Sequence, residues 1–359
     1  MNKKILLTGG HAGTPALATV DYIKKHKDWE ISWAGTSRAI EGKEVKTLES
    51  KIFSKLDVNY FEIESGRLQK RFTKHTILSL LKIPRGFWDS YKLLTKIKPD
   101  IVLSYGGFIS VPVVISAWLQ GIPVVIHEQT VAIGLANKIC APFATKIAIS
   151  RLETKKYANP AKVVHTGNPI LENILNVKRK GSKKKTIYIT GGSRGALRVN
   201  KVIFDSLKIL TKKYTIIHQT GDLDIGFAKK IRFNNYEPTN FTNPKQVHKI
   251  YESADLIVSR AGANTVAEII YHKIPSILIP IPWTRYDEQN KNAKLAKKTG
   301  IAEILTEDNL NSKNLIKLVE KQINKKLRIK KLKTLSNDKQ GAYNLVNLID
   351  SLIEWSTSI

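Results

Sequence analysis

Short apolar runs alternate along the chain with longer stretches that have helical periodicity. Such runs, rich in Ile, Val and Leu, predict strands of parallel sheets. In the first half of the chain these strands are predicted at Lys4–Leu7, Glu30–Ala34, Asn59–Ile63, Ile101–Ser104, Val124–Ile126 and Lys146–Ile149. In the second half they are predicted at Thr186–Thr190, Thr215–Gln219, Leu256–Ser259, Ser276–Ile279 and Ala302–Ile304. Helices such as Ala16–His26, Val199–Lys212 and Thr265–Tyr271 lie between them. The pattern therefore predicts an α/β fold of two Rossmann-like, doubly wound parallel-sheet domains that face a cleft.

A change in composition divides the chain near its middle. The turn-forming sequence Thr-Gly-Asn-Pro at 166–169 is followed by a basic run at 178–185, which precedes a fresh strand. We therefore expect an N-terminal domain at 1–165 and a second domain at 166–340. The apolar spacing within Gly341–Ser356 predicts one more helix, and we expect residues 341–359 to dock back on the N-terminal domain.

Two features bear on the compartment of the protein. The uncharged stretch Ile101–Ile126 is long enough to cross a bilayer, but glycines and prolines interrupt it. We interpret it as strand, helix and strand, with the helix at Val111–Leu119. The one cysteine, Cys140, excludes an intramolecular disulfide and a zinc site made of cysteines alone, and it favours the cytosol.

The charge balance is strongly basic, with 59 Lys and Arg against 30 Asp and Glu, a net charge of +29. Such a chain is attracted to polyanions, either nucleic acid or an anionic membrane surface, although compositional drift is an equally simple explanation. Within Lys74–Lys98, apolar and aromatic residues such as Phe87 and Trp88 are interleaved with Lys82 and Arg85. This mixture predicts an interfacial membrane-binding segment, or alternatively an ordinary amphipathic core helix.

In each predicted domain, a glycine-rich loop follows the first strand. The first, Thr8-Gly9-Gly10-His11, lacks the Gly-x-Gly-x-x-Gly pattern of dinucleotide-binding proteins. A histidine at such a strand–turn–helix junction is a candidate general base, or simply a polar turn residue. The second loop, Gly191–Ala196 with Asn200 soon after, can offer amide donors and a hydroxyl to a phosphate, or form a tight turn without a ligand.

Two further clusters carry hydrogen-bonding side chains. In Ser259–Glu268 a turn enters a helix, and we expect Glu268 on its first turn, where a carboxylate can accept two ribose hydroxyls or merely complement the helix dipole. Asp287–Ala293 suits sugar hydroxyls or a solvated loop. Asp222 and Asp224 form an Asp-x-Asp pair, which we interpret as turn residues and not as a metal site.

These motifs, in order and at these spacings, resemble the MurG family of glycosyltransferases over nearly the whole chain. The matching segments are Thr8-Gly9-Gly10-His11, Ser65-Gly66, Gly106-Gly107, His127-Glu128-Gln129, Gly134 with Asn137, Gly167-Asn168-Pro169, Gly191–Ala196 with Asn200, Gly262–Glu268 and Asp287–Ala293. The sequence departs from the family pattern in its shortened first loop, at Thr130, Leu171 and Arg194.

The resemblance implies a GT-B enzyme that adds N-acetylglucosamine to the undecaprenyl-linked muramyl-pentapeptide precursor of peptidoglycan. It implies that the reaction inverts the anomeric centre and that no cofactor or metal is required. It places the membrane-bound acceptor on the N-terminal domain, and the enzyme peripherally at the cytoplasmic face of the cell membrane, against an anionic surface. Two alternatives are a UDP-N-acetylglucosamine 2-epimerase and another GT-B enzyme acting on lipids. A nucleic-acid-binding protein is a third, which the scattered basic residues argue against.

The resemblance also implies roles for individual residues. Glu268 would hold the ribose, Ser193 and the amides of Ala263–Thr265 the diphosphate, Gln289 the sugar hydroxyls, and the backbone near Phe241 the uracil. The predicted catalytic residues are His11 and Glu128. The predicted UDP-N-acetylglucosamine-binding residues are Thr8, Gly9, Gly10, Thr130, Ser193, Phe241, Ala263, Asn264, Thr265, Val266, Glu268 and Gln289. The predicted acceptor or cleft residues are Tyr105, His127, Asn137 and Asn200.

Overall fold

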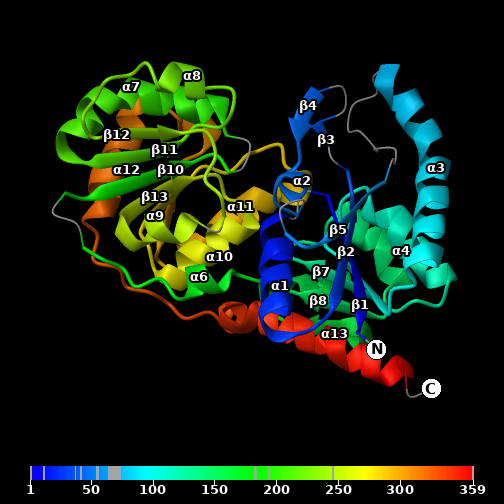
Figure 1. Cartoon of the computed structure of the whole chain (residues 1–359). Coiled ribbons are helices and arrows are strands. Elements are labelled where there is room, and N and C mark those ends of the chain that lie inside the picture. The colour runs from blue at the N-terminus through cyan, green and yellow to red at the C-terminus, as the bar shows by residue number, and fades with distance from the viewer. Residues whose placement is uncertain are drawn as a thin grey trace. The chain divides into compact units, whose positions relative to one another are not determined.

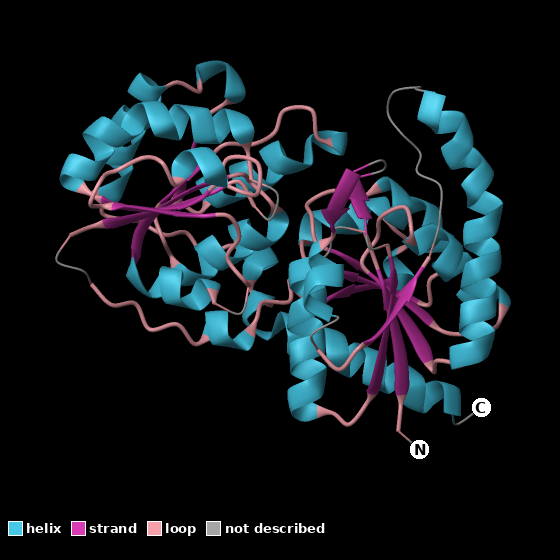
Figure 2. Cartoon of the chain, turned by 45° about the horizontal axis from the view of Figure 1, so that its top comes forward, coloured by secondary structure: helices cyan, strands magenta, loops and turns pink. Residues whose placement is uncertain are grey.

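The computed structural model describes residues 2–10, 13–36, 38–40, 43–53, 56–63, 74–181, 184–192, 195–244 and 246–357. It divides the chain into two compact units (Figure 1). Unit 1 comprises Met1–Leu171 together with Thr334–Ile359, and unit 2 comprises Glu172–Lys333. Each unit is built on a parallel sheet with helices on both faces (Figure 2).

Unit 1 contains a parallel sheet with the strand order β5-β2-β1-β6-β7-β8-β9. Its strands are β1 (Lys4–Thr8), β2 (Glu30–Gly35), β5 (Asn59–Glu62), β6 (Ile101–Ser104), β7 (Val124–Glu128), β8 (Lys146–Ile149) and β9 (Val163–His165). A small antiparallel pair consists of β3 (Arg38–Ile40) and β4 (Lys43–Lys46). The helices are α1 (Gly13–His26), α2 (Leu48–Phe53), α3 (Lys74–Ile97), α4 (Ser110–Leu119), α5 (Leu135–Cys140) and α13 (Gly341–Thr357).

The core of unit 1 explains why these segments are strands. Ile101, Val102 and Leu103 of β6 are completely buried, because helices cover both faces of this central strand. The C-terminal helix α13 packs on α1 and buries Leu345 and Ile349. Helix α13 therefore completes one face of unit 1, although it is more than 300 positions from α1 in sequence.

Unit 2 contains a second parallel sheet with the strand order β12-β11-β10-β13-β14-β15. Its strands are β10 (Thr186–Thr190), β11 (Thr215–Gln219), β12 (Tyr236–Thr239), β13 (Ala254–Ser259), β14 (Ser276–Leu278) and β15 (Ala302–Ile304). Its helices are α6 (Glu172–Leu175), α7 (Leu197–Lys213), α8 (Ile225–Ala228), α9 (Val247–Ser253), α10 (Ala263–His272), α11 (Glu288–Lys298) and α12 (Ser312–Ile323). The strand order reverses beside β10, as it does beside β1 in unit 1, and ligands of such folds bind at this switch point.

The predicted α/β class and the doubly wound parallel sheets are confirmed, and every predicted strand is present. The sequence pattern missed β3, β4, β9 and β12. The edge strand β12 contains Pro238, which lowers its strand propensity and is tolerated only because one side is unpaired. The unit boundaries also differ from the predicted ranges, because 166–171 and 334–340 lie in unit 1. No helix in the described part of the chain is both long and apolar enough to cross a membrane.

Candidate active site

The switch point of unit 1 brings two glycine-rich loops into backbone contact. The amide of Gly10, after β1, donates to the carbonyl of Gly106, after β6, at 2.8 Å. Gly107 has a φ of +93°, and a Cβ on it would lie 2.6 Å from the Gly10 nitrogen, so only glycine fits there. The predicted base His11 follows Gly10 directly in sequence but lies outside the described residues.

The hydroxyls of two predicted site residues donate hydrogen bonds to other residues of unit 1. Thr8, the last residue of β1, donates from Oγ1 to the Ala34 carbonyl at 2.9 Å and is buried. The Tyr105 hydroxyl donates to Thr19 Oγ1 at 2.6 Å, and burial raises the pKa of this tyrosine. Both side chains therefore fix the loops after β1 and β6 to their surroundings.

The carboxylate of Glu128, at the end of β7, is surrounded by donors. Its Oε1 accepts from the amide and hydroxyl of Thr130 at 3.1 and 2.9 Å. Its Oε2 accepts from the Gly134 amide and from Asn137 Nδ2, both at 2.8 Å. Burial raises the pKa of Glu128, although the four donors oppose the shift. These four donors hold the Glu128 carboxylate in one orientation, and its catalytic role stays a prediction.

His127 lies beside Glu128 and is completely buried. Its Nε2 lies 3.2 Å from the Gly167 carbonyl, and Gln129 Nε2 lies 3.0 Å from its Nδ1. Burial lowers the pKa of His127 to about 4, so the ring is neutral at physiological pH. The His127 side chain joins the end of β7 to the Gly167 carbonyl, and Asn137 joins α5 to Glu128 of β7. The acceptor-side role of both residues stays a prediction.

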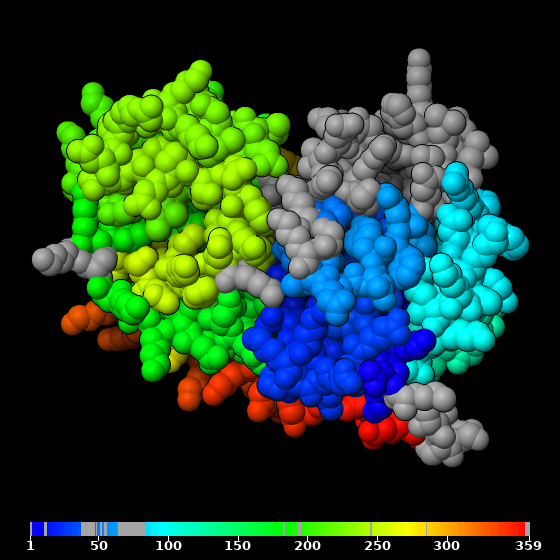
Figure 3. Space-filling view, viewed as in Figure 1, coloured from blue at the N-terminus to red at the C-terminus, as the bar shows by residue number. Residues whose placement is uncertain are grey.

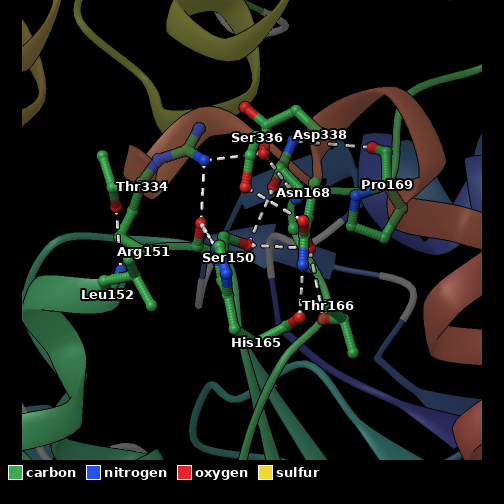
Figure 4. Close-up of polar contacts among 12 residues, drawn as sticks. Ser150, Arg151, Leu152, His165, Thr166, Asn168, Pro169, Thr334, Ser336 and Asp338 are labelled. Atoms are coloured by element: carbon green, nitrogen blue, oxygen red, sulfur yellow. Dashed lines mark hydrogen bonds and ion pairs between the residues drawn. The ribbon is translucent and has the colours of Figure 1, made fainter. Parts of the chain in front are cut away.

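The Gly167–Pro169 loop is held by the returning C-terminal segment of unit 1 (Figure 4). Asp338 accepts from the Asn168 amide at 2.9 Å and from Arg151 at 2.7 Å. Asn337 Nδ2 donates to the His165 carbonyl at 2.7 Å. The sequence marked this loop only as a turn and a family motif. Neither Arg151 nor Asp338 carried a local signal of this pairing.

The switch point of unit 2 is formed by the loop after β10. The Gly192 amide donates to Thr190 Oγ1 at 3.0 Å. Gly195 has a φ of +74°, and a Cβ there would lie 2.2 Å from the Thr220 carbonyl oxygen. Ser193, the predicted phosphate-binding hydroxyl, lies outside the described residues, as does Arg194.

The side chain of Asn200, the fourth residue of α7, contacts β11 and the loop that follows it. Its Nδ2 donates to the Thr220 carbonyl at 2.7 Å and to Asp224 Oδ2 at 2.6 Å, while its Oδ1 lies 3.1 Å from His218 Nε2. The buried amide is thus engaged within unit 2. Asp224 is engaged by the same amide, and the described residues contain no cluster of three or more histidine, cysteine or acidic residues suited to a metal.

Helix α10 begins at Ala263 with Gly262 as its N-cap, and no side chain caps it. The first-turn residues Ala263, Asn264 and Thr265 are partly exposed, and the amides of a helix N-terminus point toward the side from which an anion can approach. Val266 is buried behind them. The expectation that Glu268 lies on the first turn is wrong: the helix starts at Ala263, so Glu268 lies on the second turn.

Glu268 is nevertheless well placed for a ligand of this helix end. Its side chain is buried on α10, and the residue retains 6% of its surface. Tyr251 of α9 donates to Glu268 Oε2 at 2.6 Å. Burial raises the pKa of Glu268 to about 7, and the Tyr251 hydroxyl opposes the shift.

Gln289 is the second residue of α11 and contacts the loop between β14 and α11. Its Oε1 accepts from the Ile281 amide at 3.0 Å, which shapes the loop. Tyr286 and Asp287 both have left-handed backbone angles, with φ of 57° and 56°. Two consecutive non-glycine residues in this region store strain, which is common in ligand-binding loops. In the loop after β12, the Phe241 amide donates to Asn240 Oδ1 at 2.8 Å.

A charge cluster around the buried Glu307 lies beside the loops of unit 2, and the sequence analysis missed it. The Glu307 carboxylate forms ion pairs with Arg260 NH1 at 2.5 Å and with the more exposed Arg198 Nε at 2.9 Å. Arg260 follows β13, and Arg198 is on the first turn of α7, so the carboxylate joins the two loops at the switch point. Glu307 has no local sequence signal, because its partners are distant along the chain.

Family models and curated relatives match nearly the whole length of this chain. The N-terminal domain of glycosyltransferase family 28 matches residues 5–149, and its C-terminal domain matches residues 186–349. A UDP-N-acetylglucosamine--N-acetylmuramyl-(pentapeptide) pyrophosphoryl-undecaprenol N-acetylglucosamine transferase of Bacillus cereus is 36% identical over 89% of this chain and 91% of its own length. The enzyme with that name from Geobacillus kaustophilus is 32% identical over 99% of both chains. The crystal structure of MurG from Acinetobacter baumannii has a TM-score of 0.68 at 22% identity, covering 97% of this chain and 99% of that chain.

Proposed function

The chain belongs to the MurG family within glycosyltransferase family 28, and we propose how its described residues carry out the reaction of that family. It is a glycosyltransferase of peptidoglycan synthesis. It transfers N-acetylglucosamine from UDP-N-acetylglucosamine to undecaprenyl-pyrophosphoryl-N-acetylmuramyl-pentapeptide.

The observation that carries the donor assignment is the pairing of two features on α10. The uncapped helix N-terminus at Ala263–Thr265 suits the diphosphate, and the Glu268 carboxylate one turn further suits the two ribose hydroxyls. Phe241 would meet the uracil through its backbone, and Gln289 would bind the sugar hydroxyls with the amide that its contact to Ile281 leaves available. Thr8, Gly9, Gly10 and Thr130, also predicted to touch the donor, contribute through the loops that they shape.

In the reaction, the acceptor hydroxyl forms a bond to the anomeric carbon as the bond to the UDP oxygen breaks. The hydroxyl loses its proton to a base, for which we propose His11, and UDP leaves with the electron pair of the broken bond. Amides at the helix end stabilise the negative charge that builds on the diphosphate. This needs no cofactor or metal. Replacing His11 by Ala tests its role: single-turnover transfer should fall about 10²–10⁴-fold while UDP affinity is retained.

A surface of unit 1 suits the membrane that carries the acceptor. Helix α3 packs beside α4 and lies at the molecular surface (Figure 3). Trp88 and Tyr91 of α3 and Trp118 and Leu119 of α4 are 45–62% exposed. Lys92 lies 4.8 Å from the Trp88 ring centroid. Exposed aromatic side chains with neighbouring cations fit an anionic bilayer interface, and we propose a peripheral position at the cytoplasmic face of the membrane.

The reaction is tested by incubating the protein with labelled UDP-N-acetylglucosamine and the lipid-linked muramyl-pentapeptide, followed by product analysis. We expect label in the lipid fraction and release of UDP in equal amount. A reaction without acceptor is the control. The epimerase alternative would instead produce an isomerised amino sugar without any lipid.

A further inference from the structure

The carboxylate of Glu268 is held from one side by a single tyrosine. Tyr251, on α9, is 2% exposed, and its hydroxyl donates to Glu268 Oε2 at 2.6 Å. Among the described residues, no other group donates a hydrogen bond to this carboxylate, and the residue keeps 6% of its surface exposed. The structure thus distinguishes the two oxygens: Oε2 is bound to the protein and Oε1 is left for a ligand.

The Tyr251 ring is itself fixed by aromatic contacts. Its centroid lies 6.3 Å from that of Tyr188 in an edge-to-face arrangement and 5.8 Å from that of His272. The Tyr188 hydroxyl donates to Gln219 Oε1 at 2.9 Å, and Gln219 Nε2 donates to the Gly192 carbonyl at 2.9 Å. A ring contact and two hydrogen bonds therefore connect Tyr251, through Tyr188 and Gln219, to the glycine-rich loop after β10.

We propose that Tyr251 is a positioning residue for the nucleoside of the sugar donor, because its hydroxyl fixes the Glu268 carboxylate with Oε1 free for the ribose diol. The inference rests on the proposed function, in which Glu268 binds the ribose. A glutamate side chain has several rotatable bonds, and holding it in one orientation before the ligand arrives lowers the entropic cost of binding. The charge-assisted hydrogen bond also stabilises the ionised carboxylate, which is the form that accepts two hydroxyls.

The test compares UDP with 2′,3′-dideoxy-UDP in the wild type and in Tyr251→Phe. The phenylalanine keeps the ring contacts and removes only the hydroxyl. We expect the wild type to prefer UDP, and Tyr251→Phe to weaken UDP binding about 10-fold while dideoxy-UDP binding is unchanged. In transfer assays the donor KM should rise, and kcat at saturating donor should be retained.

Tyr236→Phe is the matched control. Tyr236 is also buried in unit 2, but its hydroxyl lies 3.0 Å from His218 Nδ1 and not at Glu268. This variant should leave both affinities unchanged. Tyr251→Phe in a Glu268→Gln background should have no further effect on the preference for the diol, because the carboxylate through which Tyr251 acts is already absent.

The outcomes separate the two assignments. If the wild type binds both nucleotides equally, Glu268 does not bind the ribose hydroxyls. The assignment of Glu268 to the donor and the role of Tyr251 are then both wrong. If the wild type prefers UDP and Tyr251→Phe keeps that preference, the donor assignment stands and the positioning role is wrong. Equal weakening of both nucleotides in Tyr251→Phe would show a merely structural role and would also overturn the proposal.

Discussion

Arg151 and Asp338 form a buried ion pair at 2.7 Å, although they are separated by 187 positions in sequence. Their side chains are 3% and 5% exposed. Asp338 also accepts from the Asn168 amide, so one carboxylate of the returning C-terminal segment joins Arg151, shortly after β8, to the Gly167–Pro169 loop (Figure 4). This cluster explains why the chain from Thr334 onward belongs to unit 1.

Asp338→Ala should destabilise unit 1 strongly. The substitution leaves the Arg151 guanidinium buried without its carboxylate and the Asn168 amide without its acceptor. Breaking a buried pair in this way costs about 3–5 kcal/mol. Chemical denaturation followed by circular dichroism measures the loss. Lys213→Ala, which breaks an exposed ion pair with Glu320 in unit 2, is the control and should leave the denaturation midpoint unchanged.

UDP binding should depend on pH through Glu268. Burial raises its pKa to about 7, so the carboxylate is only partly ionised at neutral pH and UDP affinity should rise between pH 6 and 8. The neighbouring titratable groups are Tyr251 from α9, Tyr188 from β10 and His272 on the same helix. Calorimetric titration at several pH values measures the affinity. A pH profile of UDP binding that persists in Glu268→Gln would contradict this assignment.

The raised pKa of Glu268 also affects the stability of the protein, and here the favourable contribution falls as the pH rises. Without a ligand, folded Glu268 binds a proton more tightly than the unfolded chain does. Its contribution to the free energy of unfolding should therefore be present at about pH 4.5 and decline as the pH rises toward 7. The difference between wild type and Glu268→Gln in denaturation experiments at pH 5 and pH 8 isolates this contribution.

Membrane binding should depend on Trp88 and Trp118. Both are more than half exposed, whereas Phe87 is partly buried, so replacing the two tryptophans by serine removes interfacial contacts with little loss of packing. We expect reduced flotation with anionic vesicles at low and at high salt. The control is Phe227→Ser, which removes an exposed aromatic residue of unit 2. Equal flotation of the tryptophan variant and the wild type would mean that this surface does not contact lipid.

The elements that the sequence predicted well are those with a local signal. The β6 and β10 strands were placed at their observed bounds because each is a short apolar run between polar segments. The prediction that Glu268 lies on the first turn of α10 is wrong by a few residues, because no capping side chain marks the start of this helix.

The partners of the site residues could not be predicted. Tyr251 approaches Glu268 only after α9 and α10 pack beside the sheet, and Arg151 meets Asp338 only when the chain returns to unit 1. Such pairs depend on the tertiary fold and leave no periodic trace in the sequence. Motif matching thus predicts a role for Glu128 but could not show that Thr130, Gly134 and Asn137 donate to its oxygens.

Gly107→Ala should impair transfer by separating the two loops of unit 1. The new Cβ would lie 2.6 Å from the Gly10 nitrogen, and the φ of +93° is unfavourable for alanine, so the loops after β1 and β6 must move apart. We expect a loss of stability of about 1–3 kcal/mol and a lower kcat, and we expect UDP affinity to change less than kcat, because Glu268 and the N-terminal end of α10 lie in unit 2. Gly121→Ala is the matched control. Gly121 has a φ of +71°, but a Cβ there has no neighbour within 4 Å, so this variant has the same type of backbone strain without the clash. Normal transfer by Gly107→Ala would show that contact between these loops is not needed for the reaction.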